Sequence, residues 1–438
     1  MKIKKHLSFT SMRIRLSSFF KKMPDHRQQA KINISLHDIL MSALACMYFQ
    51  DPSLLQFQKR MQDRQHRNNL QTLFGVKNIP KETQKRECID QVDRKHFRAI
   101  FKNYCLCLQR GKQLVNYEIF PGLYLVPIDG TEFFKSEKIN CEYCLRKEHK
   151  EGVIKYSHQA LQGGIMHPDQ AVVIPFMPEE ICNADGTSKQ DCEMNAAKRF
   201  IANTRRDHPQ LGIIFCGDGL FSKQPIINDV IAQRGHYIFV AKPKDHKYLM
   251  EWLAAYPKLN EAQFSDEKNN IHYYEWMNDV PLNGQENSIR VNFFRCQITN
   301  ENGKIIYQNS WVTDIVVNKE NIKILVRAGR CRWKSENECF NVLKNHGYCL
   351  DHNYGHGKKN LCFNFYLLTL LAFFFHQILE ATDGLYQAAR KKFGSKRHMW
   401  ETLRAYIKII VFNTWEELLS FALVPTNYKL IEANAQGP

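Results

Sequence analysis

The sequence predicts an α/β protein in which a mixed sheet carries an inserted antiparallel β subdomain and is flanked by N-terminal and C-terminal helical regions. Helical patterns fill residues 1–115, and from about residue 120 they give way to short apolar or alternating runs separated by turn-like segments. Between 120 and 245 the expected order is three strands, a helix, a strand, a helix and a strand, which is typical of a mixed sheet. Alternating residues at 246–318 predict the antiparallel insertion.

The N-terminal region combines a helix signal with a basic arm. The segment SLHDILMSALACMYF predicts a helix, because Ser35 is a capping residue and Asp38 follows three positions later. The first 31 residues carry nine Lys or Arg and one acid, Asp25. This arm either follows a DNA backbone or is a solvated tail. We expect residues 1–115 to form a helical, DNA-binding region.

The first part of the sheet domain, at 116–245, consists of apolar runs with turn signals between them. The predicted strands are LYLVPID, SHQALQGGIMH, AVVIPFM, GIIFCGD and YIFVAKP, and the predicted helices cover about 190–207 and 225–234. The alternating runs of the insertion, at 246–318, are HYYEWM, IRVNFFRCQI and KIIYQNSWVTDI. Their position between two candidate catalytic acids indicates that they interrupt the sheet domain.

From 319 to 438 the sequence is helical again, and we expect this part to complete the catalytic core and to add C-terminal helices. The only candidate membrane span is FNFYLLTLLAFFF, at 363–375. It is shorter than the roughly 20 residues that a span needs, and polar residues follow it closely. We therefore predict a buried core helix and no membrane partner.

Charge and cysteine usage narrow the class of partner and the compartment. Lys and Arg number 61 against 44 Asp and Glu, which gives a net charge of +17. A soluble protein this basic usually meets a polyanion, most often DNA or RNA, although an anionic membrane surface attracts the same charge. Fourteen cysteines scattered over 438 residues do not resemble the disulfide framework of a small secreted domain. The N-terminus lacks the apolar core of a signal peptide, so we expect reduced thiols in a cytoplasmic, nucleoid-associated protein.

Two aspartates follow apolar runs that end in the same way. Asp129 ends LYLVPID and precedes Gly130, and Asp218 ends GIIFCGD between two glycines. Taken alone, each aspartate would be interpreted as part of a common Asp-Gly turn. Two apolar strands that end in the same way favour a functional interpretation. Strand ends converge in α/β sheets, and Mg²⁺ prefers oxygen ligands. Two such ions about 4 Å apart activate an attacking hydroxyl and stabilise the leaving oxygen of a phosphodiester.

A third acid, Glu336, lies in the helical segment RWKSENECFNVLKNHGY. Helical spacing puts Arg332 four residues before it and Phe340 four residues after it on one face. The competing acid, Glu338, lies about 200° around an α-helix from Glu336, so both cannot point into one site. The alternative for the Arg332 and Glu336 pair is an ordinary surface ion pair.

These blocks together resemble a known family. VPIDGTEFF is similar to the first-aspartate block, FCGDGLFS to the second and RWKSENECF to the glutamate block of insertion-sequence DDE transposases. The chain resembles the branch with a β-strand insertion before the catalytic glutamate, over roughly residues 24–380. Further matching segments are SEKINCEYCLRK, KQDCE, KPKDH and GYCLDHNYGHG. The resemblance implies an RNase H-like catalytic domain.

The resemblance assigns roles to residues of this chain. It implies that Asp129, Asp218 and Glu336 are a catalytic triad that holds two Mg²⁺ ions, with Mn²⁺ as a substitute. It implies that Arg332 and Lys344 contact DNA phosphate, and that Trp333 is either a core residue or a base-stacking residue. The family has a Tyr three residues before the Arg and a Lys seven after the Glu. This chain has Gly329 and Leu343 there, and Lys344 is one residue late, about 100° around a helix.

The implied function is a transposase, a DNA-recombining endonuclease that cleaves the ends of its element and transfers the strand to target DNA. Its partners are the terminal inverted repeats and the target, and holding both ends together implies a homodimer on DNA. Two alternatives remain open. One is a related metal-dependent nuclease without strand transfer, and the other is a non-catalytic DNA-binding protein derived from a transposase.

Two further groups of residues have competing interpretations. Cys141 and Cys144 form a CxxC knuckle that His149 and His158 can complete as a structural Zn²⁺ site, or they are two free thiols in a loop. His352 and His356 lie in the glycine-rich, basic segment HNYGHGKKN. This segment is either a loop that approaches DNA phosphates or a turn that positions the long apolar helix.

Overall fold

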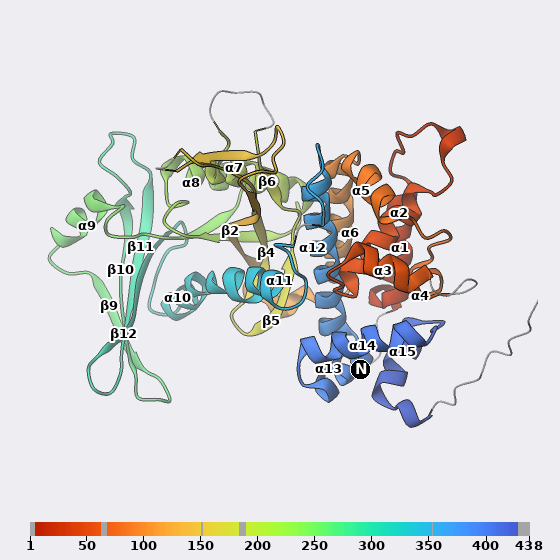
Figure 1. The fold of residues 1–438 in the computed structure, drawn as a ribbon. Helices are drawn as coiled ribbons and strands as arrows, with labels where there is room; N and C mark the ends of the chain where they lie inside the picture. The colour runs from red at the N-terminus through yellow and green to blue at the C-terminus, as the bar shows by residue number, and fades with distance from the viewer. Residues whose placement is uncertain (1–4, 63–67, 150–151, 184–189, 353, 428–438) are drawn as a thin grey trace, which may run out of the picture. The chain divides into compact units, whose positions relative to one another are not determined.

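The computed structural model describes residues 5–62, 68–149, 152–183, 190–352 and 354–427 (Figure 1). The chain divides into two compact units. Lys112–Asn341 form one, which we call the sheet unit, and Met1–Gly111 with Val342–Pro438 form the other, which we call the helical unit. The protein is a mixed α/β structure with flanking helices, as the sequence predicts.

The sheet unit is built on a single mixed sheet of 12 strands. Nine of them follow the order β3-β4-β2-β7-β8-β12-β11-β10-β9, while β1 pairs with β2, and β5 and β6 pair with β4. The strands are β1 (Glu118–Phe120), β2 (Leu123–Ser136), β3 (Leu145–Glu148), β4 (Ile154–His167), β5 (Gln170–Pro175), β6 (Glu179–Ile181), β7 (Gly212–Gly217), β8 (His236–Val240), β9 (Asn260–Ser265), β10 (Ile271–Pro281), β11 (Arg290–Thr299) and β12 (Ile305–Thr313).

The centre of this sheet is parallel. Strands β2, β7 and β8 run in one direction, and β4 and β12 flank them as antiparallel neighbours. The β7 and β8 sequences are almost continuously apolar and buried, as expected for strands covered on both faces. Figure 1 shows helices α7 (Glu193–Asp207) and α8 (Gln224–Ala232) on one side of the sheet and α10 (Ile322–Arg330) on the other.

The insertion extends the same sheet. After α9 (Lys247–Ala254), strands β9 to β12 form an antiparallel meander, and β12 pairs with β8 through Trp311 opposite Val240. The antiparallel strands expected at 246–318 are therefore present, and they continue the parallel core edge to edge. The pairing places residues of β12 beside the carboxyl end of β8.

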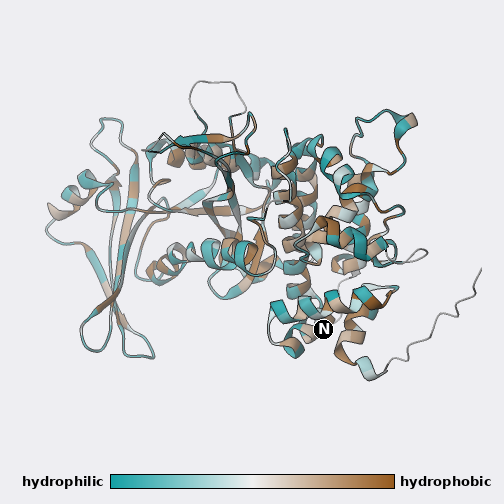
Figure 2. Cartoon of the chain, viewed as in Figure 1, coloured by the Kyte–Doolittle hydropathy of each residue, from teal (hydrophilic) through white to brown (hydrophobic). Residues whose placement is uncertain are grey.

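The helical unit joins both ends of the chain around one core. Its helices are α1 (Phe9–Lys21), α2 (Leu36–Tyr48), α3 (Leu54–Gln62), α4 (Asn69–Phe74), α5 (Glu82–Asp90), α6 (Arg98–Arg110), α12 (Leu361–Thr382), α13 (Gly384–Phe393), α14 (Lys396–Ile409) and α15 (Trp415–Leu423). The predicted cap of α2 is confirmed, because Ser35 Oγ accepts the Asp38 N–H at 3.1 Å. Figure 2 shows brown, hydrophobic stretches along these helices beside teal ones, the pattern of helices around a core.

Helix α12 is the central element of this unit. It packs against α1, α2 and α5, and Asn364 Nδ2 donates to the carbonyls of Ile89 and Val92, both at 2.8 Å. The helix has 22 residues, more than the apolar run at 363–375 suggests. The prediction that this segment is too short to span a membrane is therefore wrong. By length and composition α12 can cross a membrane, and 94% of its apolar window is buried inside the protein.

Candidate functional site

The register of β2 against β7 sets the positions of two aspartates. The parallel ladder runs from Leu123 opposite Gly212 to Pro127 opposite Cys216. Asp129 and Asp218 each lie two residues beyond the last pair of this ladder. Since neighbouring strands are about 4.8 Å apart, the two carboxylates start from adjacent points at one edge of the ladder.

The two aspartates differ in local structure. Asp218 directly follows β7, as predicted, whereas Asp129 lies inside β2, which continues to Ser136. The expectation that both aspartates end strands is therefore wrong for Asp129. The reason is tertiary, because β4 pairs with β2 far beyond the β7 ladder, out to Ser136 opposite Tyr156.

The Asp218 turn needs the glycine before it. A Cβ on Gly217 would lie 2.6 Å from Cδ2 of Phe221, which is fully buried, so a larger residue cannot be accommodated there without movement. Asp218 Oδ1 accepts the Leu220 N–H at 2.8 Å, and the Asp218 carbonyl accepts the Phe221 N–H at 3.1 Å. These contacts hold the aspartate in a tight turn at the end of β7.

Glu336 lies in η5 (Ser335–Phe340), a π-helical turn that follows α10. Ser335, Cys339 and Phe340 are buried and anchor the turn, while Glu336 is exposed. Just before the turn, Lys334 Nζ donates to the Gln170 carbonyl of β5 at 2.7 Å. The expected α-helix is thus a π-helical segment, a form that recurs at functional sites.

The pKa of Asp129 responds to its burial and to the other two predicted acids. Burial raises the pKa of Asp129, and the negative charges of Asp218 and Glu336 raise it further. Opposing them, Arg332 Nη1 lies 3.0 Å from Asp129 Oδ2, and Asp129 Oδ1 accepts the Gly130 N–H at 3.0 Å. Arg332 therefore makes its ion pair with Asp129, from the turn between α10 and η5.

A fourth carboxylate, Glu193, belongs to this group and was missed by the sequence reasoning. It begins α7, and a Cβ on Gly130 would lie 2.8 Å from its carboxyl carbon. Burial raises the pKa of Glu193 to about 7, and the charges of Asp129 and Asp218 contribute to this shift. The signal was present in the sequence, because Gly130 next to a candidate catalytic acid allows another group to approach the backbone closely.

Beside Asp218 lies a pocket that carries positive and aromatic groups. It is lined by Val240, Lys242, Tyr307, Asn309, Gly329, Arg330, Arg332 and Trp333 as well as Asp218. Trp333 is 49% exposed, which excludes the interpretation of it as a core residue. The Arg330 guanidinium lies 4.2 Å from the ring centre of Tyr307, a residue of the inserted β12. Cationic and aromatic side chains thus lie beside Asp218.

The remaining predicted DNA-binding residues belong to the helical unit. Lys344, in α11 (Asn341–Asn345), lies 3.7 Å from Asp351 in an ion pair. The exposed His352 lies edge-on to Tyr354, and the buried His356 has Nδ1 2.9 Å from the Gly357 carbonyl.

The backbone of the glycine-rich segment is organised around Asp90. Its carboxylate accepts the N–H groups of four consecutive residues, at distances of 2.9 to 3.0 Å, from Lys358, Lys359, Asn360 and Leu361. A Cβ on Gly357, whose φ is +71°, would lie 2.4 Å from Asp90 Oδ1. These contacts favour the interpretation of the segment as a turn that starts α12.

A second cluster lies on the β4 side of the sheet unit. The Sγ atoms of Cys141 and Cys144 are 3.8 Å apart, and they lie 3.5 and 3.4 Å from His158 Nε2. Cys144 and His158 are buried, and His158 Nδ1 lies 3.3 Å from Glu180 Oε1. His149 was also predicted for this site, but it lines a different pocket. A buried Cys and His cluster that can bind a metal is therefore present.

No disulfide joins the cysteines, all of which lie in the described part of the chain. Neither a scan against models of protein families nor a search of curated proteins found a match for the sequence. The interpretation of function therefore depends on the geometry of the two clusters.

Proposed function

We propose that the protein is a DNA transposase of the DDE type with an RNase H-like core. The observation that carries this proposal is the β2–β7 register, which brings Asp129 and Asp218 to adjacent points, together with the electrostatic influence of Glu336 on Asp129. A net charge of +17 supports a polyanionic substrate.

The acids fit the divalent ions that such chemistry uses. The charges of neighbouring acids help to raise the pKa of both Asp129 and Glu193, and Arg332 is the cation paired with Asp129. Uncompensated carboxylates in a partly buried site favour a hard divalent cation with oxygen ligands. Asp129, Asp218 and Glu336 would hold two Mg²⁺, or Mn²⁺ in its place. Bound there, such ions lower the pKa of a water and neutralise charge on the leaving oxygen.

The residues of the chain would orient the substrate. The Arg332 guanidinium, 35% exposed in its side chain, can exchange Asp129 for a phosphate oxygen, since its planar fork matches both. Lys242 and Arg330 line the same pocket and would hold neighbouring phosphates, and the exposed Trp333 offers a surface for stacking.

The proposed reaction needs no covalent enzyme intermediate. Water attacks the phosphorus at the element end, the bond to the 3′ oxygen breaks, and a free 3′-hydroxyl and a 5′-phosphate result. The 3′-hydroxyl then attacks a target phosphorus, and the target strand's 3′ oxygen leaves with the proton. We propose terminal inverted repeats and target DNA as partners, a homodimer as the assembly and the nucleoid as the location.

A cleavage assay in Mg²⁺ tests this function, with DNA that carries the sequences flanking the reading frame. We expect the wild type to cut at the element end, and Asp218→Asn and Glu336→Gln to bind the DNA without cutting it. Glu338→Gln, two residues from Glu336, is the matched control and should cut normally. Cleavage without a joined product would favour the nuclease alternative. Binding without cleavage in Mg²⁺ or Mn²⁺ would favour the non-catalytic relative.

For the second cluster, we infer that the metal is Zn²⁺. A tetrahedral zinc ion places two thiolates about 3.8 Å apart and a thiolate and an imidazole nitrogen about 3.6 Å apart. The distances among Cys141, Cys144 and His158 agree with these values. Glu180 contacts the other nitrogen of His158, as carboxylates do behind zinc-bound histidines.

Metal analysis of the purified protein tests the zinc site independently of DNA cleavage. We expect about one zinc per chain, lost in Cys144→Ser and retained in Cys192→Ser, whose thiol is exposed and outside the cluster. A full zinc content in Cys144→Ser would refute the assignment.

A further inference from the structure

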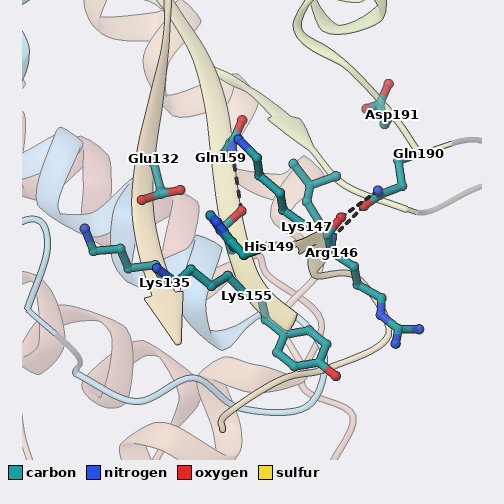
Figure 3. Close-up of a pocket in the computed structure, with 12 residues that line it drawn as sticks. Glu132, Lys135, Arg146, Lys147, His149, Lys155, Gln159, Gln190 and Asp191 are labelled. Carbon is teal, nitrogen blue, oxygen red and sulfur yellow. Dashed lines mark hydrogen bonds between the residues drawn. The ribbon is translucent and has the colours of Figure 1, made fainter. Parts of the chain in front are cut away.

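A second pocket of the sheet unit has positive side chains on three adjacent strands. It lies beyond the carboxylate site along β2, and β3 and β4 complete its walls (Figure 3). Lys135 comes from β2, Lys147 from β3 and Lys155 from β4. Figure 3 shows these side chains together with His149 over the strands.

Strand register places the three lysines on one face. Lys147 is directly opposite Lys155, while Lys135 and Leu145 are both opposite Ser157 of β4. Because alternate residues of a strand share a face, Lys155 and Ser157 point to the same side. Like charges directly opposite each other destabilise an antiparallel pair, so this arrangement favours an anionic ligand.

Positive side chains outnumber the acids of this pocket, where Glu132 and Asp191 are the lining carboxylates against three lysines and Arg146. Lys155 Nζ lies 3.8 Å from Glu137 Oε1, and both side chains are about half exposed, so this pair contributes little. Asp191 also lines the pocket, but Arg199 Nη2 engages it at 2.7 Å. Among the described residues, Lys135 and Lys147 make no ion pair.

The backbone around the pocket is held in place before any ligand binds. Gln190 accepts the Arg146 N–H at 2.5 Å and donates to the Arg146 carbonyl at 2.7 Å, which ties β3 to the segment before α7. The Arg146 guanidinium lies 5.7 Å from the ring centre of Tyr156. Cys144 of the metal cluster directly precedes β3, and Asn183 donates to its carbonyl at 3.1 Å. A fixed framework reduces the entropy lost on binding.

We propose that this lysine pocket binds backbone phosphates of the DNA on which the carboxylates act, about half a helical turn from the scissile phosphate. The spacing follows from β2, where Lys135 is six residues from Asp129, or roughly 20 Å of strand. Measured along the axis of B-DNA, that length corresponds to about six phosphates of one strand. This inference rests on the proposed function for the location of the scissile phosphate, but the binding itself does not require catalysis.

The test is the salt dependence of DNA binding by the full, zinc-loaded chain, with no Mg²⁺ or Mn²⁺ added so that no strand is cut. In the double variant Lys147→Gln with Lys155→Gln, we expect the slope of log affinity against log salt to fall by about 1.8, since each phosphate contact contributes about 0.9. The affinity at 0.1 M salt should fall by about tenfold or more. Lys147→Arg with Lys155→Arg should keep the wild-type slope.

A matched control removes two positive charges elsewhere. Lys268→Gln with Lys304→Gln changes exposed lysines at the hairpin turns of the insertion and should leave the slope unchanged. An unchanged slope in the pocket variant, or an equal loss in the control, would overturn the proposal. So would tighter lysine-dependent binding to duplex RNA than to duplex DNA.

Phosphate ethylation interference locates the contacts. We expect phosphates about six positions from the cleavage point to become insensitive to ethylation in the pocket variant. Failure of this proposal and failure of the proposed function are distinguishable. If the salt slope depends on the lysines but the protein never cuts DNA, phosphate binding by the pocket is supported and the proposed enzyme function is refuted. If the protein cuts DNA normally but the pocket variant keeps the wild-type slope, the enzyme function is supported and phosphate binding by the pocket is refuted.

Discussion

Gly329 offers a quantitative test of the packing between α10 and β12. A Cβ on Gly329 would lie 2.6, 2.8 and 3.0 Å from Nε1, Cε2 and Cδ1 of Trp311. Trp311 is fully buried and stacks on Phe294 with ring centres 5.2 Å apart, so the indole has little freedom to move away. We therefore predict that Gly329→Ala destabilises the sheet unit.

The expected magnitude is the difference between two opposing terms. Forcing a methyl group into a packed interior costs about 1–3 kcal/mol. Replacing glycine by alanine in a helix gains up to about 1 kcal/mol, and less at the end of α10, where Gly329 lies. The net expectation is a loss of about 1–2 kcal/mol in the free energy of unfolding.

Urea denaturation measures the loss in the free energy of unfolding. Hydrogen exchange of the amides in β12 and α10 then shows whether the loss is located where the clash occurs. Gly384→Ala is the matched control, because a Cβ on Gly384 at the start of α13 meets nothing within 4 Å. Combining Gly329→Ala with Trp311→Phe should show a coupling energy of about 0.5–3 kcal/mol. If Gly329→Ala is as stable as the wild type and exchange in β12 is unchanged, the steric explanation is refuted.

Three further predictions concern charged and titratable groups. Asp90→Asn should lower the stability of the helical unit by about 2 kcal/mol, since it weakens charge-assisted hydrogen bonds to four N–H groups, and thermal unfolding would detect this. Burial, assisted by the charge of Lys396, lowers the pKa of His376 well below its usual range, so the unfolded chain takes up this proton first as the pH falls below about 6.5. The free energy of unfolding of the wild type should therefore fall by up to about 1.4 kcal/mol per pH unit between pH 6.5 and 5.5, relative to that of His376→Gln. The same pH dependence in both proteins, measured by urea denaturation, would contradict this. Without DNA, Lys147→Gln should raise stability by about 0.2–1 kcal/mol by removing the repulsion from Lys155, and a lower melting temperature would argue against that repulsion.

Local sequence signals determined most of the secondary structure. The Ser35 cap begins α2, and the apolar runs around Asp129 and Asp218 form β2 and β7. Strand and helix periodicity, capping residues and glycine positions act over a few residues, so one chain is enough to recognise them. The same signals identified the knuckle at Cys141 and Cys144 and the alternating strands of the insertion.

Only the tertiary structure decided how these pieces form sites. The β2–β7 register aligns the two aspartates, Arg332 pairs with Asp129 across the sheet unit, and Glu193 reaches Gly130 from a different helix. Likewise His158, and not the nearer His149, meets the cysteines, because β4 returns it beside them. These are contacts between residues distant in sequence, and hydrophobic periodicity within one segment does not say which distant strand or side chain that segment meets. The sequence by itself therefore identified most residues of the two candidate sites, while long-range pairing determined where each of them lies.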